Sequence, residues 1–535
     1  MKTTTLQKVF TLLFFLVVFQ SLHAQQYNAS ETIDTGNIRA LINSNGILFQ
    51  QMPDFLYSGF EAPKDGGINA TFEGDLWIGG LDDGGQLHMA ASTYRQIGDD
   101  FFPGPIAVNG EAGDIETWDR LWKVGKSEIE YHKAHYSDAG YVVPQRIANW
   151  PGNGPAGFDA IMAPFADLNN NGIYEPASGD YPSIYGDQAV YFIYNDLALA
   201  HTETGAAPLG FEIHGMAYSF NAATNVLLEN SIFFNYTLKN KSANNYHDLY
   251  LGLWNDFDLG CFTDDYVGTD AAKNSIFVIN QDSIDGDVGC GESYGANPPA
   301  LAVTWLSHPL SKSIGYHNDF STLGNPENST DYYDYLRAVW KDGSPMAVDS
   351  LHPDGYNGSE PVDYYFPGIS DSSVSGQPSN WWWNANLDPT DIRMIGSIGP
   401  FEIAPGGTMS LDFAYNFLPD NGSDDDGEGR LALSNSLQDI IDLYKNGTIT
   451  SAEQPEVKNT EITVSPNPFH EITTIRFSGK FETLQVMDVT GRIVFQQHVD
   501  HQSSITFGRN ELPNGVYLLQ LSSKNQHFTS KIIIQ

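Results

Sequence analysis

Ser465-Pro466-Asn467-Pro468-Phe469 opens the last part of the chain, in which short segments alternate apolar and polar residues. Apolar residues recur two positions apart, so the side chains of each pair face one side of an extended strand: Ile462/Val464, Ile475/Phe477, Leu484/Val486 and Ile505/Phe507. Turn-forming residues separate the segments, as in Asp488-Val489-Thr490-Gly491 and Pro513-Asn514-Gly515. Short strands at this spacing predict a small antiparallel β-sandwich over residues 461–535.

Three short motifs follow one another in this region: "PNPF" from Pro466, "GR" at Gly491 and "GVYLL" from Gly515. The chain then ends at Lys531-Ile532-Ile533-Ile534-Gln535. In this order the motifs resemble the C-terminal sorting domain of the type IX secretion system of Bacteroidota. The residues that carry the resemblance are Pro466, Asn467, Pro468, Gly491, Arg492, Gly515 and Tyr517.

The resemblance implies two partners, the type IX translocon of the outer membrane and a surface sortase that removes the domain. The rest of the chain is then released or attached to an anionic lipopolysaccharide. The alternative is an ordinary accessory sandwich that binds a ligand.

The first 24 residues predict a secretory signal peptide. Lys2 and Lys8 supply positive charge, residues 9–18 are nearly all apolar, and Ala24 offers a small residue for cleavage. This apolar run is too short for a stop-transfer helix, and no other run is long enough to span a bilayer. We therefore expect a secreted protein or one held at the outer-membrane cell surface, with no transmembrane segment in the mature chain.

The sequence between the two ends divides into a passenger, residues 25–450, and a polar linker, residues 451–460. The chain contains 51 Gly, 27 Tyr and 31 Phe and shows few long helical patterns, which predicts a mostly β structure with many loops. Because the passenger exceeds one typical core, we expect two sandwich-like sub-domains with few helices. Strands are predicted at 190–194, 211–220, 231–238 and 249–254, and helices at 127–135 and 437–444.

Several segments of the passenger carry a second resemblance, among them "DLWIGG" from Asp75, "WNDFDLG" from Trp254 and "GPFEIAPGG" from Gly399. They resemble a group of large exported Bacteroidota proteins that carry the same sorting domain and have no assigned activity. The resemblance spans residues 37–447 and implies a β-rich surface protein. It implies no chemistry.

The passenger carries all of the formal net charge of −40, because residues 461–535 contain six acids and six bases. Such an acidic surface disfavours nucleic acid and anionic membranes as partners. It keeps a protein soluble by self-repulsion, and it also attracts Ca²⁺. Both interpretations stay open for the bulk of the charge.

The chain has two cysteines, Cys261 and Cys290, and it is exported to a compartment that permits disulfides. We predict that they form a bridge, with two free buried thiols as the alternative. In the chain-entropy description, closing this loop contributes about 3.5 kcal/mol to stability.

Asp167-Leu168-Asn169-Asn170-Asn171-Gly172-Ile173-Tyr174-Glu175 is the strongest chemical signal of the passenger. Ca²⁺ takes six to eight oxygen ligands, and a loop with oxygen donors at alternate positions and a glycine at the sixth can surround one ion. The predicted ligands are Asp167, Asn169, Asn171, the backbone of Ile173, Glu175 and Asp180. We expect this calcium to be structural.

The loop departs from the EF-hand pattern because position 12 is Ser178 and not Glu, and Asp180 replaces it. Amides in place of carboxylates weaken the site toward the range of extracellular modules, about 10⁻⁴–10⁻³ M. The alternative is a turn in which these Asn and Asp side chains bond only to their own backbone.

Two further groups have an apolar or solvated alternative. Asp256 and Asp258 lie two residues apart and offer a second calcium site, although a solvated loop is favoured. The consecutive residues Trp381, Trp382 and Trp383 offer aromatic faces for stacking on sugar rings, with core packing as the alternative.

No catalytic signature stands out, since Gly-x-Ser-x-Gly, His-Glu-x-x-His and phosphate-loop motifs are absent from the sequence. The sequence therefore predicts a non-enzymatic surface or secreted protein that is stabilised by calcium and binds an extracellular glycan or a surface protein. The alternative is a carbohydrate-active enzyme that acts on extracellular polysaccharide through the Trp run and an unidentified acid pair.

Overall fold

The computed structural model describes residues 29–51, 58–94, 98–286, 290–349, 351–367, 391–419, 428–450, 463–476, 483–488, 492–499, 504–509, 512–522 and 527–535. Within these ranges the protein is mostly β, which confirms the predicted fold class. The chain divides into two compact units, Met1–Ala452 and Glu453–Gln535. No helix in the described ranges is long and apolar enough to cross a membrane.

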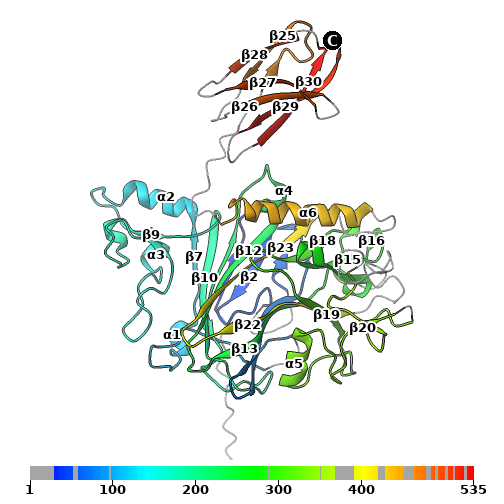
Figure 1. The fold of residues 1–535 in the computed structure, drawn as a ribbon. Helices are drawn as coiled ribbons and strands as arrows, with labels where there is room; N and C mark the ends of the chain where they lie inside the picture. The colour runs from blue at the N-terminus through cyan, green and yellow to red at the C-terminus, as the bar shows by residue number, and fades with distance from the viewer. Residues whose placement is uncertain are drawn as a thin grey trace, which may run out of the picture. The chain divides into compact units, whose positions relative to one another are not determined.

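A nine-stranded antiparallel sheet forms one layer of the N-terminal unit (Figure 1). Its strand order is β14 (Asp265–Asp270), β15 (Ser275–Asn280), β18 (Ala300–Trp305), β23 (Thr408–Leu418), β12 (Ser231–Asn240), β11 (Phe211–Ser219), β10 (Gln188–Asn195) and β6 (Phe102–Pro103), with β7 (Trp122–Gly125) also paired to β10. The strands predicted at 190–194, 211–220 and 231–238 are confirmed in β10, β11 and β12.

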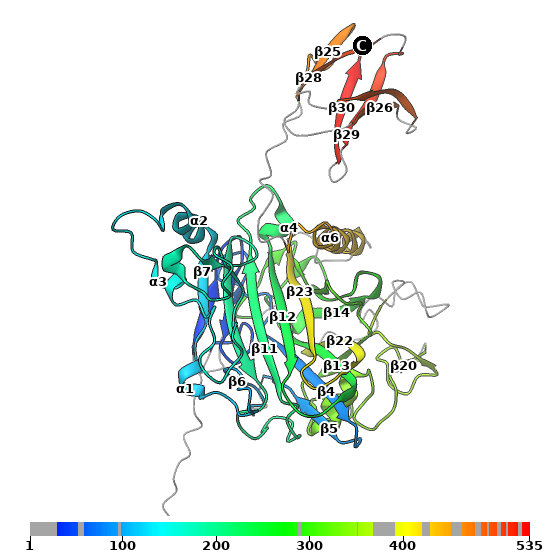
Figure 2. The ribbon, with the colours of Figure 1, turned by 60° about the vertical axis from the view of Figure 1, so that its left-hand side comes forward.

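A five-stranded antiparallel sheet forms the second layer (Figure 2). Its order is β19 (Lys312–His317), β22 (Ile392–Ile403), β13 (Tyr246–Asp256), β4 (Glu73–Asp82) and β5 (Leu87–Ala90). The strand predicted at 249–254 is confirmed in β13. A small sheet of β1 (Ser30–Ile33), β2 (Arg39–Asn43) and β3 (Phe60–Glu61) precedes it in the chain.

The two large sheets pack face to face and share one apolar core. Tyr415 on β23 donates a hydrogen bond to Asn255 Oδ1 on β13 at 2.6 Å, and its hydroxyl fills the space above Gly74 on β4. Trp305 on β18 lies in the same way against Gly396 on β22. These rings fit between the sheets because the glycines opposite them lack a Cβ, so the two layers form a close-packed sandwich.

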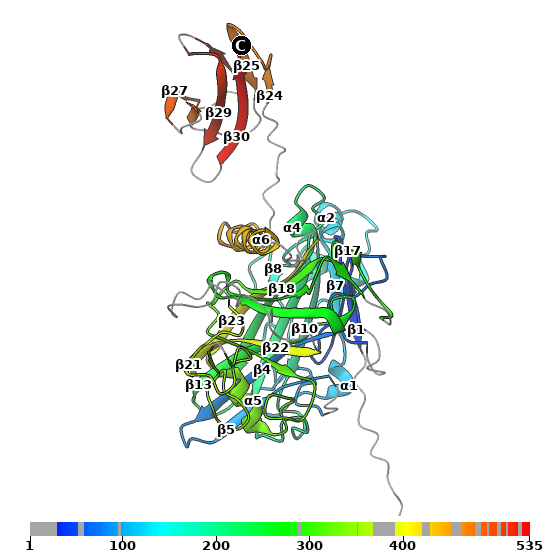
Figure 3. The ribbon, with the colours of Figure 1, turned by 90° about the vertical axis from the view of Figure 1, so that its right-hand side faces the viewer.

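A helix covers the outer face of each large sheet (Figures 2 and 3). Helix α5 (Ser329–Leu336) lies on the five-stranded sheet, where Leu336 packs over Gly79 and Gly252. Helix α6 (Glu428–Lys445) places Leu437 against Phe277 of the nine-stranded sheet and confirms the helix predicted around 437–444. Helices therefore close both open faces of the sandwich.

The remaining described elements of this unit are short and lie in its loops. They are α1 (Ile115–Trp118), α2 (Lys126–His135), α3 (Gln145–Ala148), α4 (Val226–Glu229), the 3₁₀ turns η1 (Pro176–Ser178), η2 (Phe262–Asp264) and η3 (Ala271–Lys273), and the strand pairs β8 (Phe165–Ala166) with β9 (Tyr181–Pro182), β16 (Ile284–Asp285) with β17 (Gly295–Ala296) and β20 (Ala347–Val348) with β21 (Glu360–Pro361). Helix α2 confirms the helix predicted at 127–135.

The C-terminal unit contains a three-stranded and a four-stranded antiparallel sheet. The first has the order β24 (Thr463–Ser465), β25 (Ile472–Arg476), β28 (Ser504–Gly508), and the second β27 (Ile493–His498), β26 (Thr483–Asp488), β29 (Gly515–Ser522), β30 (His527–Ile534). Inward residues of both sheets form one core, which includes Ile475, Leu484, Phe507 and Leu519. The predicted small antiparallel sandwich is confirmed.

Candidate calcium loop and sorting domain

A two-stranded hairpin brings together the ends of the loop that the sequence predicts to bind calcium. Ala166 on β8 pairs with Tyr181 on β9, so Asp167 and Asp180 stand at the base of the loop, one on each side. Gly172, with a φ of +78°, and Asn170, with a φ of +59°, turn the chain between them. Both positions have left-handed backbone, which glycine adopts freely and asparagine tolerates.

Backbone donors fix the side-chain oxygens inside the loop. Gly172 N donates to Asp167 Oδ2 at 2.6 Å, Asn171 N to Asn169 Oδ1 at 3.0 Å, and Ile173 N to Asn171 Oδ1 at 2.8 Å. These N–H groups, and first of all that of Gly172, lower the pKa of the Asp167 carboxyl. Asp167 is therefore negatively charged throughout the physiological range.

The loop side chains converge on Glu175. The amide nitrogens of Asn169 and Asn171 donate to Glu175 Oε2, at 3.2 Å and 2.5 Å. Four of the predicted ligand residues are thus gathered on one side of a single turn. The oxygens of both amides accept from backbone N–H groups, so each amide has its nitrogen on Glu175 and its oxygen on the loop backbone.

Asp180 holds the backbone of the loop. It is completely buried, and its Oδ1 and Oδ2 accept hydrogen bonds from Leu168 N at 2.9 Å and Glu175 N at 2.8 Å. His132 on α2 is also buried, and its Nε2 donates to Asp180 O at 3.1 Å. The sequence predicts Asp180 as a calcium ligand, and that role stays a prediction. The structure shows Asp180 as the residue that anchors both halves of the loop.

Among the described residues, two groups of three His, Cys, Asp or Glu side chains bring ligand atoms within 4.8 Å of one another, and neither lies in this loop. The first consists of Asp256, Asp258 and Asp391. The buried guanidinium of Arg393 contacts two of these, with Nε and NH2 each 3.1 Å from the Asp256 carboxylate and NH1 on Asp391. Arg393 supplies the positive charge that a metal would supply.

The predicted solvated loop at Asp256 is therefore wrong, since the residue is only 1% exposed. Arg393 lies beside Asp256 because β13 and β22 are neighbouring strands and the two residues pair in register.

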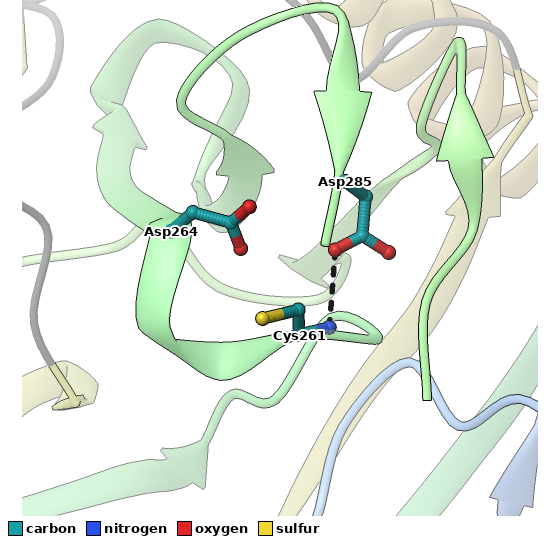
Figure 4. A group of neighbouring side chains, drawn as sticks. All are labelled: Cys261, Asp264 and Asp285. Atoms are coloured by element: carbon teal, nitrogen blue, oxygen red, sulfur yellow. Dashed lines mark hydrogen bonds between the residues drawn. The ribbon is translucent and has the colours of Figure 1, made fainter. Parts of the chain in front are cut away.

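The second group, Cys261, Asp264 and Asp285, lies around the disulfide loop (Figure 4). Cys261 is joined to Cys290 in a disulfide with a Cα–Cα distance of 5.6 Å, so its sulfur is not a thiolate ligand. The carboxylates serve the backbone: Asp285 Oδ1 accepts from Cys261 N at 3.1 Å, and Asp264 Oδ2 from Gly286 N at 3.0 Å. This group closes a loop and does not form a metal centre.

A cavity of about 440 Å³ lies beside residues 110–115 and the segment Leu197–Ala198. Its two acids are already engaged, because Asp114 caps α1 by accepting from Thr117 N at 3.0 Å and Glu111 Oε2 accepts from Asn109 Nδ2 at 2.9 Å. Trp381, Trp382 and Trp383 lie outside the described residues.

In the C-terminal unit, the "PNPF" motif attaches to the last strand. Asn467 Oδ1 accepts a hydrogen bond from Ile533 N, and its Nδ2 donates one to Lys531 O, both at 2.8 Å. One side chain thus makes two hydrogen bonds to the backbone of β30, as a neighbouring strand would. Phe469 continues the pairing through its backbone, with Phe469 N to Ile533 O at 3.0 Å, and its ring enters the core. Pro466 and Pro468 flank the asparagine.

The other motif residues shape turns and the core. Arg492 Nε donates to Asp488 Oδ2 at 3.0 Å across the β26–β27 turn, and Gly491 lies outside the described residues. Gly515 begins β29, and the ring of Tyr517 enters the core while its hydroxyl donates to Pro513 O at 2.9 Å. These motif residues thus contribute to the folding of the sandwich.

The C-terminal sandwich, with its "PNPF" motif joined to the last strand, is a compact unit with a core of its own. Residues 463–535 match the family described as the secretion system C-terminal sorting domain. This part of the chain is a type IX sorting domain, and the protein is secreted or attached to the cell surface by that pathway.

The chain also has weaker likenesses to solved structures. It is similar to a polysaccharide lyase, with 7% identity and a TM-score of 0.18, over 60% of this chain and 34% of that one. It is similar to the BSP domain of a biofilm-associated protein, with 10% identity and a TM-score of 0.14, over 65% of this chain and 59% of that one. The chain thus spans about a third and about three fifths of these proteins. At these TM-scores neither likeness carries an argument. No curated protein matches the chain.

Proposed function

We propose that the passenger is a calcium-stabilised binding protein that type IX export delivers to the cell surface or the medium. The observation that carries this proposal is the loop from Asp167 to Asp180. It holds Asp167, Asn169, Asn171 and Glu175 in one turn, and hydrogen bonds orient every one of these side chains. Calcium prefers such oxygen donors and is abundant outside the cell.

A structural role for the ion follows from the position of the loop. Asp180 and His132 anchor its base to α2 and to the β8–β9 hairpin, while Asn169, Asn171 and Ile173 are exposed at its tip. An ion bound there replaces the Asn–Glu175 hydrogen bonds with stronger contacts and holds the tip against the anchored base. The ion stabilises a surface loop of a rigid sandwich, and such loops are where proteins place their binding residues.

The ligand class proposed is an extracellular glycan or a surface protein, because the strongly acidic passenger disfavours nucleic acid and anionic membranes. A carbohydrate-active enzyme is the second candidate, and it rests on the sequence alone. Binding is the function favoured here because the Asp167–Asp180 loop supports it.

The test uses residues 25–450 mixed with a panel of insoluble polysaccharides and with whole bacteria, in calcium or in chelator, and measures depletion from solution. Calcium-dependent depletion that Asp167→Ala weakens is the expected result. If depletion is the same in chelator as in calcium, the protein binds the surface but calcium is not needed for that binding. Absence of depletion on every surface would overturn the binding proposal, and release of soluble sugar would favour the enzyme.

A further inference from the structure

The four-stranded sheet of the sorting domain has an aliphatic band on the face turned away from its core. Side chains alternate along β29: Tyr517 and Leu519 are buried in the core, at 4% and 1% exposure, whereas Val516 and Leu518 point outward, at 38% and 40%. The outer face of a small soluble sandwich is normally polar. The outward residues of the "GVYLL" motif are not needed for the core and require another explanation.

Register extends this band across all four strands. Leu518 on β29 pairs with Met487 on β26, and Met487 with Ile493 on β27, which is 47% exposed. On the other side, Val516 pairs with Ile533 on β30. Directly opposite residues of neighbouring strands share a face, so these five side chains are contiguous. We call Met487, Ile493, Val516, Leu518 and Ile533 the aliphatic band.

The rest of this face is polar at the positions whose side chains the structure describes. Gln485 pairs with Gln496 and Gln520, and none of the described outward residues of β26, β27 and β29, nor Lys531 and Ile533 on β30, is Asp or Glu. Lys531 pairs with Leu518 and is exposed, and the ion pair of Arg492 with Asp488 lies next to Ile493 and Met487 in the chain. In a chain with 66 acids and 26 bases, a face whose described outward positions carry a lysine and no acid is a distinct surface.

We propose that the aliphatic band is the surface by which a protein of the secretion machinery docks the cargo, through an apolar patch with a carboxylate that meets Lys531. The proposal rests on the sorting role of residues 463–535. Apolar side chains gathered on a soluble module mark an interaction site. The charge at the edge of the band favours an acidic complement over a basic one.

The size of the band favours a machinery protein over a second copy of this chain. Five partly exposed side chains offer at most a few hundred Å², whereas a stable dimer buries about 800 Å² on each partner. A small apolar patch suits a partner that must bind the cargo briefly and then release it.

The test follows export of the full-length chain in a bacterium with a type IX system and measures the fractions in the medium, on the surface and retained in the cell. The face variants are Val516→Thr with Leu518→Gln, and separately Lys531→Glu. The matched control, Gln485→Ser with Gln520→Ser, alters the polar half of the same face. A chain ending at Ala452 serves as the sorting-negative control. Thermal melting of each purified full-length variant reports folding.

We expect the face variants to lose about tenfold in exported fraction, the size of an effect worth 1.4 kcal/mol at an interface, while their melting and the Gln control stay like wild type. Lys531→Arg should retain export. If both face variants are exported normally and the chain ending at Ala452 is retained, the aliphatic band is not the docking surface, and the sorting role of residues 463–535 stands. Export of the truncated chain would overturn the sorting role itself. A wild-type dimer that the Val516/Leu518 variant abolishes would assign the band to a second copy and overturn the proposal.

Discussion

Glu73 and Asp75 lie two residues apart on β4, and both carboxyl groups are enclosed in the sandwich, with 0% and 2% of the residues exposed. The two carboxyl groups interact with each other, and Asp75 also interacts with the backbone of Leu48, but the described residues offer their four oxygens no further hydrogen-bond donor. Burial raises the pKa of Asp75 to about 7, and burial together with the neighbouring Asp75 raises the pKa of Glu73 well above its usual value. Asp256 on β13 and Glu203 add to the negative potential at Glu73.

This pair predicts that stability falls as the pH rises. Above about pH 4 the unfolded chain has lost the Asp75 proton, while the folded chain keeps it until about pH 7. The folded state binds more protons in this window, so the free energy of unfolding declines from about pH 4 to pH 7. Asp75→Asn removes this contribution, and denaturant unfolding at a series of pH values should show a flatter profile for the variant than for wild type.

The exposed Glu402 provides the control for this measurement, because Glu402→Gln also removes one carboxyl and should leave the profile like that of wild type. Parallel profiles for wild type and Asp75→Asn would show that the buried pair does not control the pH dependence.

The local patterns of the sequence predicted much of the fold. Alternation predicted β11 and β12, and the spacing of Leu437, Ile440 and Tyr444 predicted α6, because one apolar face is what each element needs to bury. Pairing between distant segments was not predictable, as in β13 with β22. The burial of Glu73 depends on such pairing, because β13 lies beside β4. The local sequence shows only that Glu73 and Asp75 directly precede an apolar segment that begins at Leu76.

The candidate site shows the same limit. The spacing of Asp167, Asn169, Asn171 and Glu175 predicted that these residues come together in one turn, and the structure gathers them. The anchoring role of Asp180 depends on the β8–β9 hairpin, whose two-residue strands have no pattern of their own. Local spacing thus predicts a loop, whereas its attachment to the fold comes from tertiary contacts.

Calcium should stabilise the passenger through the Asp167–Asp180 loop. At ten times the dissociation constant, a ligand that binds only the folded state contributes about 1.4 kcal/mol. Melting of residues 25–450 should therefore rise when millimolar calcium replaces chelator, and Asp167→Ala should remove the difference. The control is Asn170→Gly, because residue 170 is not a predicted ligand and glycine accepts its φ of +59°. Identical melting of wild type in calcium and in chelator would reject the site.

The Cys261–Cys290 disulfide should contribute to stability by restricting the unfolded chain. It closes a loop with a sequence separation of 29 residues, for which the chain-entropy description gives about 3.5 kcal/mol. The double variant Cys261→Ser, Cys290→Ser should unfold at a lower denaturant concentration than wild type. A reductant should lower the wild-type midpoint toward that of the double variant and leave the double variant unchanged. Equal midpoints for oxidised wild type and the double variant would contradict the prediction.

The ion pair of Asp256 with Arg393 should tolerate loss of one partner poorly, because both side chains are buried, at 2% and 3% exposure. Arg393→Met leaves the carboxylates of Asp256 and Asp391 without their guanidinium, and such uncompensated buried charge costs about 3–5 kcal/mol. The control is Arg39→Met, which breaks the pair with Glu61 at a position where the Arg39 side chain is 41% exposed. Solvent already screens that pair, so its loss should cost at most about 1 kcal/mol. Denaturant unfolding of both variants provides the comparison. Equal losses would mean that the buried guanidinium is not what stabilises the Asp256 carboxylate, and that Asp256 takes up a proton instead.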